Sequence, residues 1–337
     1  MSYPTTRLRR LRRTPALRAA FTETRLHPAQ LALPVFVKEG LAEPVPIASM
    51  PGVFQHSVDS VVALARQAVE AGVGGLVLFG IPVVKDAVGR GGWDPEGPVC
   101  AAARAIRDAV GDAVALWADV CQCEYTDHGH CGPLDAAGRV VNDDAVEGYV
   151  RDAVAYAEAG VDLVAPSGMM DGQVGAIRVG LDAAGFTQVG IVAYAAKYAS
   201  AFYGPFRDAA ESGMVAGDRL DHQMDPANRR EAQLELNLDA VEGADVLMVK
   251  PALAYLDVLA DARRRFDLPL AAYHVSGEYA MIQAAAERGW LDGPEALREA
   301  TISIRRAGAD VVLTYAALEL ARVRTLVGDP GVDHRRP

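Results

Sequence analysis

The sequence predicts an α/β fold of the (β/α)8 or TIM-barrel class, in which eight parallel strands form a closed barrel inside a ring of helices. Eight short apolar runs alternate along the chain with stretches that have the periodicity of amphipathic helices. Most of the runs are continuous blocks of valine, leucine, isoleucine and alanine, as expected for parallel strands covered on both faces. The chain of 337 residues is also long enough, because such a barrel takes roughly 250 residues.

The predicted strands and helices follow one another in regular order. The strands are residues 31–37, 75–79, 113–120, 163–165, 189–194, 246–249, 268–273 and 311–315. Helical periodicity is clearest in residues 60–71, 144–159, 173–184, 229–242 and 279–288. Four of these helices are followed by a glycine, the usual residue at the left-handed end of a helix: Gly72, Gly160, Gly185 and Gly243.

An open, doubly wound sheet can hold the same eight strands, so the segments between the strands decide the fold. No G-x-G-x-x-G motif follows the first strand, where a dinucleotide-binding sheet carries it. We find no linker rich in proline, glycine or serine, no internal repeat and no low-complexity tract. The sequence therefore favours one catalytic barrel over residues 26–330. One long stretch, residues 198–227, separates the fifth strand from its helix, and loops of this length are usually functional lids.

Composition excludes several classes of protein. Hydrophobic residues make up 51% of the chain, which excludes a disordered protein, and the net charge of −11 argues against a nucleic-acid partner. No apolar run reaches the roughly 18 residues of a membrane-spanning helix, so we expect no membrane partner. The four cysteines follow no apolar segment of the signal-peptide type, which favours a reducing, cytoplasmic location.

The first 25 residues differ from the rest of the chain in charge. Six arginines precede Glu23, the first acidic residue: Arg7, Arg9, Arg10, Arg12, Arg13 and Arg18. Such a start is found in transit peptides, in nucleic-acid-binding arms and in arms that pack on another subunit. Because the remainder of the chain is strongly acidic and can receive a basic segment, we predict that residues 1–25 form an N-terminal oligomerisation arm.

The C-terminal ends of the predicted strands carry residues suited to chemistry. Active sites of barrels of this class lie at that end. The residues at or just beyond the strand ends are Asp119, Cys121, Ser167, Lys197, Lys250, Ser276 and Tyr315. Because they come from six different strands, we expect them to meet at one rim of the barrel.

Three of the cysteines, Cys121, Cys123 and Cys131, lie within eleven residues. Thiolates at this spacing can converge on one tetrahedral ion, and soft sulfur ligands select zinc over magnesium. A structural zinc site is normally closed by a fourth protein ligand, which His128 or His130 could supply, whereas a catalytic site keeps one position open. A redox cluster is a third possibility, and the residues alone leave all three open.

Two lysines, Lys197 and Lys250, end neighbouring apolar strands. Burial of a lysine favours its neutral amine, and a second ammonium nearby favours the neutral form further. The neutral amine is the form that condenses with a ketone to a Schiff base. A single lysine at a strand end often extends to solvent or binds a phosphate, but two on adjacent strands of one rim favour covalent catalysis.

Within the predicted lid, Arg207 and Arg219 stand near aromatic residues and a Gly-Pro pair. An arginine binds a carboxylate through two parallel hydrogen bonds, so both residues suit an acidic substrate. Surface salt bridges explain the same arginines equally well, and the residues alone do not decide between the two explanations.

Long stretches of the chain resemble the porphobilinogen synthase family, also called the 5-aminolevulinate dehydratase family. The matching sequences are CEYTDHGHCG at 123–132, MDGQV at 170–174, FYGPFR at 202–207, NRREA at 228–232, MVKPA at 248–252 and VSGEYAMI at 275–282. The resemblance covers nearly the whole chain and includes the basic start. It implies a (β/α)8 lyase that joins two 5-aminolevulinate molecules into porphobilinogen with loss of two waters, in tetrapyrrole and heme biosynthesis.

The same resemblance assigns the covalent and metal chemistry. It implies that Lys250 forms a Schiff base with the substrate that becomes the propionate side of the product, and Lys197 with the one that becomes the acetate side. Cys121, Cys123 and Cys131 match the family's zinc ligands, which implies a catalytic zinc with one open position.

The resemblance also implies binding roles. Ser276 and Tyr315 would hold one substrate carboxylate, and the lid residues Arg207, Arg219 and Gln223 would hold the other. The remaining residues expected to line the site are Asp119, Ser167 and Tyr273.

Regulation and assembly are implied in the same way. Glu235 corresponds to the family's allosteric magnesium position at a subunit boundary, and the usual assembly is a homo-octamer. The chain departs from the family at Ala193 and Ala195, where serines are usual, and at Leu220 and His222, where lysine and tyrosine are common. Two other classes of protein explain part of the pattern: a Schiff-base aldolase accounts for the lysines, and a non-catalytic zinc scaffold accounts for the cysteines.

Overall fold

A closed barrel of eight parallel strands forms the centre of the protein. The computed structural model describes residues 3–322. The barrel strands are β1 (Leu31–Lys38), β4 (Gly75–Ile81), β5 (Ala115–Val120), β6 (Leu163–Pro166), β7 (Gly190–Lys197), β8 (Val246–Lys250), β9 (Leu270–His274) and β10 (Val311–Thr314). Each strand pairs with its neighbours, and β10 pairs back with β1 through the register Leu31 to Val312. The predicted barrel is therefore confirmed over the open sheet, with all eight apolar runs as strands.

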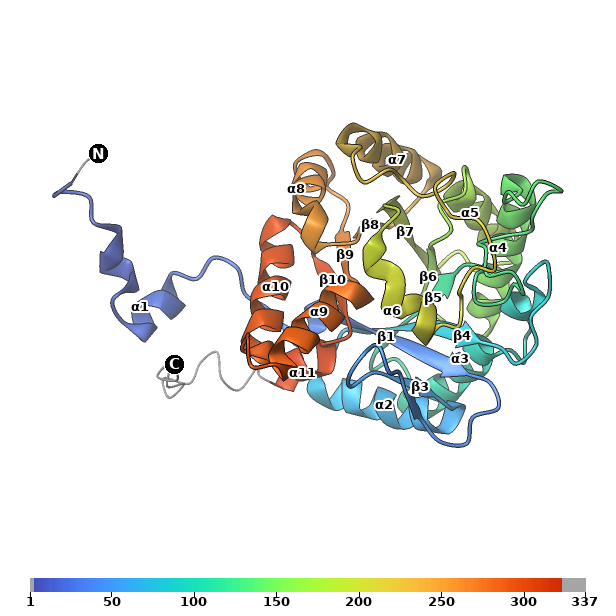
Figure 1. The fold of residues 1–337 in the computed structure, drawn as a ribbon, viewed down its shortest axis with the longest axis horizontal. Coiled ribbons are helices and arrows are strands. Elements are labelled where there is room, and N and C mark those ends of the chain that lie inside the picture. The colour runs from blue at the N-terminus through green and yellow to red at the C-terminus, as the bar shows by residue number, and fades with distance from the viewer. Residues whose placement is uncertain (1–2, 323–337) are drawn as a thin grey trace.

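Most of the helices surround the barrel in a ring, as Figure 1 shows. The helices are α1 (Pro15–Ala20), α2 (Val58–Ala71), α3 (Pro98–Val110), α4 (Asn142–Glu158), α5 (Gln173–Ala183), α6 (Gly204–Ala209), α7 (Arg229–Glu242), α8 (Leu256–Arg265), α9 (Ser276–Glu287), α10 (Gly293–Ala307) and α11 (Ala317–Arg322). Short 3-10 helices are η1 (Leu8–Arg12), η2 (Pro28–Gln30), η3 (Arg90–Trp93), η4 (Ala201–Tyr203) and η5 (Leu253–Tyr255). A small hairpin of β2 (Val45–Pro46) and β3 (Phe54–His56) extends the sheet beside β1. The five helices predicted from periodicity are all present.

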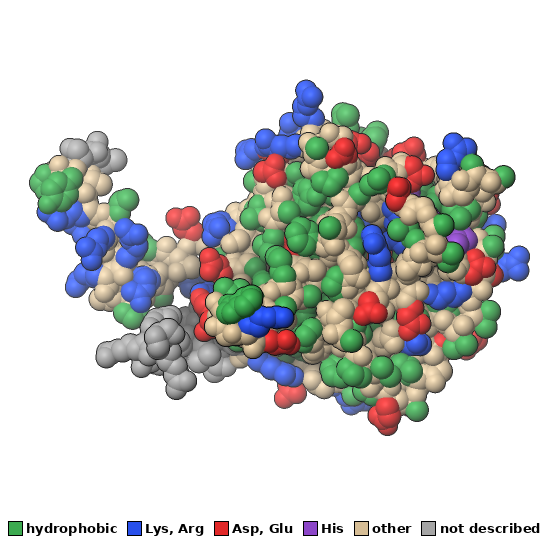
Figure 2. Space-filling view, viewed as in Figure 1, with side chains coloured by type: hydrophobic (Ala, Val, Ile, Leu, Met, Phe, Trp, Pro, Cys, Tyr) green, Lys and Arg blue, Asp and Glu red, His purple; other side chains and the backbone are tan. Residues whose placement is uncertain are grey.

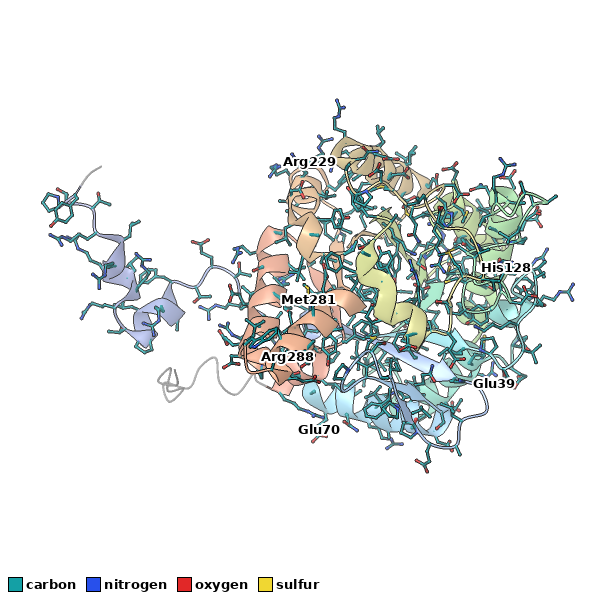
Figure 3. The ribbon with its side chains drawn as sticks, viewed as in Figure 1. Glu39, Glu70, His128, Arg229, Met281 and Arg288 are labelled. Carbon is teal, nitrogen blue, oxygen red and sulfur yellow. The ribbon has the colours of Figure 1, made fainter. Side chains whose placement is uncertain are left out.

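Salt bridges join neighbouring helices of the ring. Arg229, at the first residue of α7, lies 3.3 Å from Asp257 of α8 and also pairs with Asp261 (Figure 3). The helix ends follow the glycines expected from the sequence, because Gly72 and Gly243 cap α2 and α7 in the left-handed conformation.

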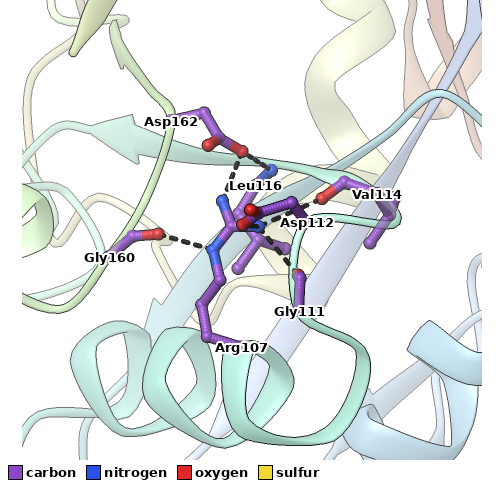
Figure 4. A network of polar contacts seen from close by, with 7 residues as sticks. All are labelled: Arg107, Gly111, Asp112, Val114, Leu116, Gly160 and Asp162. Atoms are coloured by element: carbon purple, nitrogen blue, oxygen red, sulfur yellow. Dashed lines mark hydrogen bonds and ion pairs between the residues drawn. The ribbon is translucent and has the colours of Figure 1, made fainter. Parts of the chain in front are cut away.

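Three aspartates hold the N-terminal ends of the barrel strands together. Each follows a Gly-X pair, and each accepts a hydrogen bond from the backbone of the preceding strand: Asp162 from Leu116 at 2.7 Å, Asp245 from Ile191 at 2.7 Å and Asp310 from Leu270 at 2.9 Å. The three backbone N–H groups of these aspartates return bonds to the same strands. We call this arrangement the aspartate staple. Arg107 of α3 forms an ion pair with Asp162 of this staple and also donates a hydrogen bond to the Gly160 carbonyl (Figure 4).

The N-terminal segment projects away from the barrel (Figure 1). Neither η1 nor α1 contains a buried residue, and large apolar side chains such as Leu8 and Phe21 are exposed. Its arginines form a cluster of basic side chains on the projecting part (Figure 2). Between residues 3 and 322, every helix is too short or too polar to cross a membrane.

Candidate active site

Two lysines meet at the C-terminal rim of the barrel. Lys197 ends β7, Lys250 ends β8, and the two residues are paired in the sheet register. Each side chain is only 5% exposed. Both open onto a small cavity whose walls are formed by Cys123, Glu124, Ser167, Lys197, Tyr203, Phe206, Arg207, Arg219 and Lys250. This cavity brings Ser167, Lys197 and Lys250 of the strand ends together with Arg207 and Arg219 of the predicted lid.

Lys250 is the most perturbed base of the site. Burial lowers the pKa of its amine from 10.5 to about 7, and the charge of Lys197 acts in the same direction, while Asp119 opposes both. Because the pKa is near neutrality, a large share of Lys250 is neutral and nucleophilic at pH 7. Four aromatic rings surround its Nζ at centroid distances of 4.4 to 5.3 Å: those of Tyr273, Tyr194, Phe206 and Tyr203.

Asp119 and Ser167 lie beside the lysines. Asp119 is the penultimate residue of β5 and accepts a hydrogen bond of 2.8 Å from the Ser167 hydroxyl. Burial raises the pKa of Asp119, while Lys250 and Lys197 lower it. The ammonium of Lys197 donates to the Ser167 carbonyl. A carboxylate, a hydroxyl and two amines thus share one buried space, as proton transfer requires.

The three cysteines converge as the sequence predicted. Cys121 Sγ and Cys123 Sγ are 3.4 Å apart, and the three buried sulfur atoms, including that of Cys131, all lie within 4.8 Å of one another. Sulfur atoms around a tetrahedral zinc are about 3.8 Å apart, given Zn–S bonds near 2.3 Å, so the thiols fit that ion. Within residues 3–322, no other three cysteine, histidine or carboxylate side chains converge in this way.

The two nearby histidines are bound elsewhere. His130 Nε2 lies 2.8 Å from the Ala216 carbonyl oxygen, and His128 Nε2 lies 3.3 Å from that of Ala87. Figure 3 places His128 at the periphery of the barrel, near α4. Neither imidazole joins the three sulfur atoms. The donor set therefore fits an open three-thiolate site better than one closed by histidine.

The predicted lid, residues 198–227, contains a short helix, α6, and carries three buried N–H donors. Arg207 lies on α6, which crosses the end of the barrel in Figure 1, and Arg219 and Gln223 lie on the segment that returns to α7. Arg207 Nε, Arg219 Nε and Gln223 Nε2 are buried and have no hydrogen-bond partner among the described residues. Burial lowers the pKa of Arg207, and Arg219 lowers it further. The two arginines line the lysine cavity, where their unpartnered N–H donors suit an anion, whereas Gln223 lines another, more acidic cavity.

Ser276 and Tyr315, the residues expected at the other carboxylate, have hydrogen-bond partners within the protein. The Tyr273 and Tyr315 hydroxyls are 3.0 Å apart at the ends of neighbouring strands. The Ser276 hydroxyl accepts a bond of 3.0 Å from the Phe206 N–H and donates to the Phe202 carbonyl at 3.3 Å, so it is bonded to the lid. The sequence did not indicate this contact between Ser276 and the lid.

Glu235 lies outside the barrel rim, in a second and more open cavity. This cavity has a volume of about 430 Å³ and is rich in carboxylates. Its acidic residues are Asp171, Asp221, Asp225, Glu231 and Glu235. Burial raises the pKa of Glu235, and the neighbouring acids raise it further. Carboxylate oxygen suits a hard divalent cation, but within residues 3–322 no three of these carboxylates converge as the cysteines do.

The residues that depart from the family pattern do not line the lysine cavity. Leu220 is 65% exposed, so it extends to solvent. His222 is paired with Asp221 through Nδ1 at 2.5 Å, and burial lowers its pKa to about 4. Ala193 and Ala195 are fully buried.

Three residues that line the cavity were missed in the sequence: Glu124, Tyr203 and Phe206. Glu124 is 2% exposed, and its Oε2 lies 3.2 Å from Cys123 Sγ. Burial raises the pKa of Glu124 to about 7, with Asp119 adding to the effect. Its position directly after Cys123 was the available signal.

Comparisons with known proteins agree on one family. Residues 5–323 match the family model described as delta-aminolevulinic acid dehydratase. The delta-aminolevulinic acid dehydratase of Streptomyces coelicolor is 55% identical over 323 residues, which are 95% of this chain and 98% of that protein. The protein of that name from Mycobacterium tuberculosis is 56% identical over 322 residues, 95% and 98% of the two chains. A crystal structure of delta-aminolevulinic acid dehydratase (porphobilinogen synthase) from Toxoplasma gondii with its product porphobilinogen superposes with a TM-score of 0.92 at 43% identity, covering 98% and 96%.

Proposed function

Because the chain belongs to the delta-aminolevulinic acid dehydratase family, it is a hydro-lyase with porphobilinogen synthase function, and we propose that it works through two lysine Schiff bases and a thiolate-bound zinc. In this reaction two 5-aminolevulinate molecules combine into porphobilinogen and release two waters. The observation that carries the proposal is the pair of buried lysines, Lys197 and Lys250, on adjacent strands.

Lys250 carries the essential Schiff base in this proposal. Its lowered pKa makes the neutral amine available to attack the ketone of the substrate that becomes the propionate side. Lys197 would bind the ketone of the second substrate, which becomes the acetate side. Asp119 and Ser167 are placed to accept and return the protons that leave with each water.

Cys121, Cys123 and Cys131 would hold the zinc and leave its fourth position to substrate or water. A zinc ion in such a site supplies Lewis-acid polarisation of a bound oxygen or nitrogen. Arg207, Arg219 and Gln223 would bind the carboxylate of one substrate, which the unpartnered donors on the lid support. Ser276 and Tyr315 would hold the other carboxylate, and Tyr273 would line the site.

A decisive test incubates the protein with 5-aminolevulinate and follows pyrrole formation with an aldehyde colour reagent. Borohydride added during turnover should attach substrate mass to Lys250. A Schiff-base aldolase would give the adduct without a pyrrole, and a zinc scaffold would give neither.

Assembly and regulation complete the proposal. We expect a cytoplasmic homo-octamer in which residues 1–25 pack on a neighbouring barrel and magnesium near Glu235 tunes the assembly. The exposed apolar residues of the arm support this role, because burying them on a partner is favourable. Four free cysteines suit a reducing compartment.

Deleting residues 1–20 should reduce the particle size measured by light scattering. Glu235→Ala should remove stimulation by magnesium while the zinc content stays constant, because magnesium prefers carboxylate oxygen. An arm-deleted protein of unchanged size would reject the assembly role.

A further inference from the structure

A buried carboxylate, that of Glu278, joins two loops of the active-site rim. Glu278 lies in the first turn of α9 and is 1% exposed. Its Oε2 accepts the Val275 N–H at 3.0 Å, and its Oε1 accepts the Leu253 N–H at 2.8 Å. The backbone N–H groups of Ala252 and Ala254 also lower the pKa of this carboxylate, while burial raises it.

The backbone N–H groups that donate to the Glu278 carboxylate lie at the starts of two helices. Ala252, Leu253 and Ala254 form the N-terminus of η5, which leads directly into α8, while Val275 is the N-cap of α9. The first N–H groups of a helix have no partner inside it, so a buried helix start needs an acceptor from elsewhere. One carboxylate satisfies both starts, and it thereby fixes the distance between them.

Each of these helix starts adjoins a residue of the proposed chemistry. Lys250 lies two residues before Ala252, and Ser276 directly follows Val275. Between Lys250 and Ala252 stands Pro251, which has no N–H to anchor the loop itself. Lys250 itself is paired with Lys197 in the sheet, and its carbonyl oxygen accepts the Tyr198 N–H at 2.9 Å. Glu278 adds an anchor to the chain that directly follows Pro251.

The same turn also supports the lid. Ser276 is hydrogen-bonded to the backbone of Phe206 and Phe202. Next to it, Gly277 lies so close to the lid that a Cβ at this position would be 2.5 Å from the Phe202 carbonyl oxygen. The Phe206 ring in turn lies 5.2 Å from Lys250 Nζ. Glu278 thus connects the lysine loop, the Ser276 turn and the lid helix without lining the cavity itself.

We propose that Glu278 is a positioning residue that sets Lys250 Nζ relative to the Ser276 turn and the lid, an inference that rests on the proposed Schiff-base chemistry. Its carboxylate oxygens are both engaged with backbone N–H groups, so it acts through Lys250 and not on substrate. Glu278→Gln keeps the size of the side chain but turns an N–H2 group toward N–H donors. Glu278→Asp keeps the charge but is one methylene too short to reach both loops.

The experiment measures borohydride trapping of 5-aminolevulinate on Lys250 by mass spectrometry, together with kcat, KM and thermal unfolding. Both variants should trap substrate on Lys250 more slowly and lose on the order of 100-fold in kcat, the scale of a misplacement near 1 Å, while KM changes much less. Asp245→Asn is the matched control, because it alters a carboxylate that accepts a backbone N–H at the opposite end of the barrel. Its trapping rate should equal that of the unmodified protein.

Wild-type trapping rates in Glu278→Gln or Glu278→Asp would overturn the proposal. So would an equal loss of trapping in Asp245→Asn, since this would assign the effect to stability alone. If the unmodified protein itself forms no adduct at Lys250, the proposed function fails, which is a separate result.

Discussion

The two ends of the barrel use charged side chains in opposite ways. At the N-terminal end, Asp162, Asp245 and Asp310 are exposed to water, and each is paired with a backbone N–H. At the C-terminal end, Lys250 and Asp119 are 5% exposed, and Asp119 Oδ1 has no partner among the described residues. Exposed, paired charges cost little and align strands, whereas buried charges are costly and have shifted pKa values. The comparison indicates that one end specifies the fold and the other carries the chemistry.

Removing the amine of Lys250 should give the largest effect on activity, and it should show that the C-terminal end of the barrel carries the chemistry without stabilising the fold. Lys250→Ala should lower turnover on the order of 10⁴-fold or more, because the covalent intermediate cannot form. Its thermal stability should not fall, since the variant removes a buried amine that is partly charged at pH 7. Pyrrole formation and calorimetry check both parts, and near-normal turnover in this variant would refute the assignment.

Metal removal should give the next largest effect. Chelation, or Cys→Ala at Cys121, Cys123 or Cys131, should lower activity to near background and release about one zinc per site. The barrel should remain folded by circular dichroism, because its large apolar core does not depend on a metal. Unfolding on chelation would instead indicate a structural zinc, and full activity without metal would exclude a catalytic one.

The pH dependence of Schiff-base formation tests the electrostatics of the C-terminal end. The pKa of Lys250 is lowered from 10.5 to about 7, so the neutral amine dominates above pH 7 and falls about tenfold per unit below it. Trapping at Lys250 should therefore rise with pH and level off above 7. A rate that keeps rising to pH 10 would show that this lysine has an ordinary pKa.

The smallest effect is expected at the N-terminal end. Asp245→Asn should cost about 1 kcal/mol of unfolding free energy through the weakened bond to Ile191, with kcat unchanged. Denaturant unfolding and steady-state kinetics check the two parts. A loss of activity in the folded variant would mean that the two ends are coupled.

Much of the fold could be predicted because its signals are local. Continuous apolar runs mark all eight barrel strands, and the strand-end positions of Lys197 and Lys250 are enough to place both amines at one rim. The hydrogen bond between Glu278 and the Leu253 N–H could not be predicted, since it joins residues 25 apart through a backbone group that carries no sequence signal. The hydrogen bonds between Ser276 and the predicted lid could not be predicted for the same reason. The short helix α6 also lies in a segment that the sequence indicated only as a long loop.

The aspartate staple has a consequence for how the barrel is divided. The Gly-X-Asp triplets precede β6, β8 and β10, and each binds the strand before it, so the strands fall into two-stranded quarters. The remaining quarter, β1 with β4, has Gly74 at the corresponding position, and its N–H binds the Leu31 carbonyl in the same way. A side chain there would meet the Ala29 carbonyl oxygen at 2.2 Å. The N-terminal end of the barrel is thus fourfold pseudo-symmetric. This symmetry is broken between β1 and β4, where the backbone of Ala29 occupies the space that an aspartate side chain takes in the other three pairs of strands.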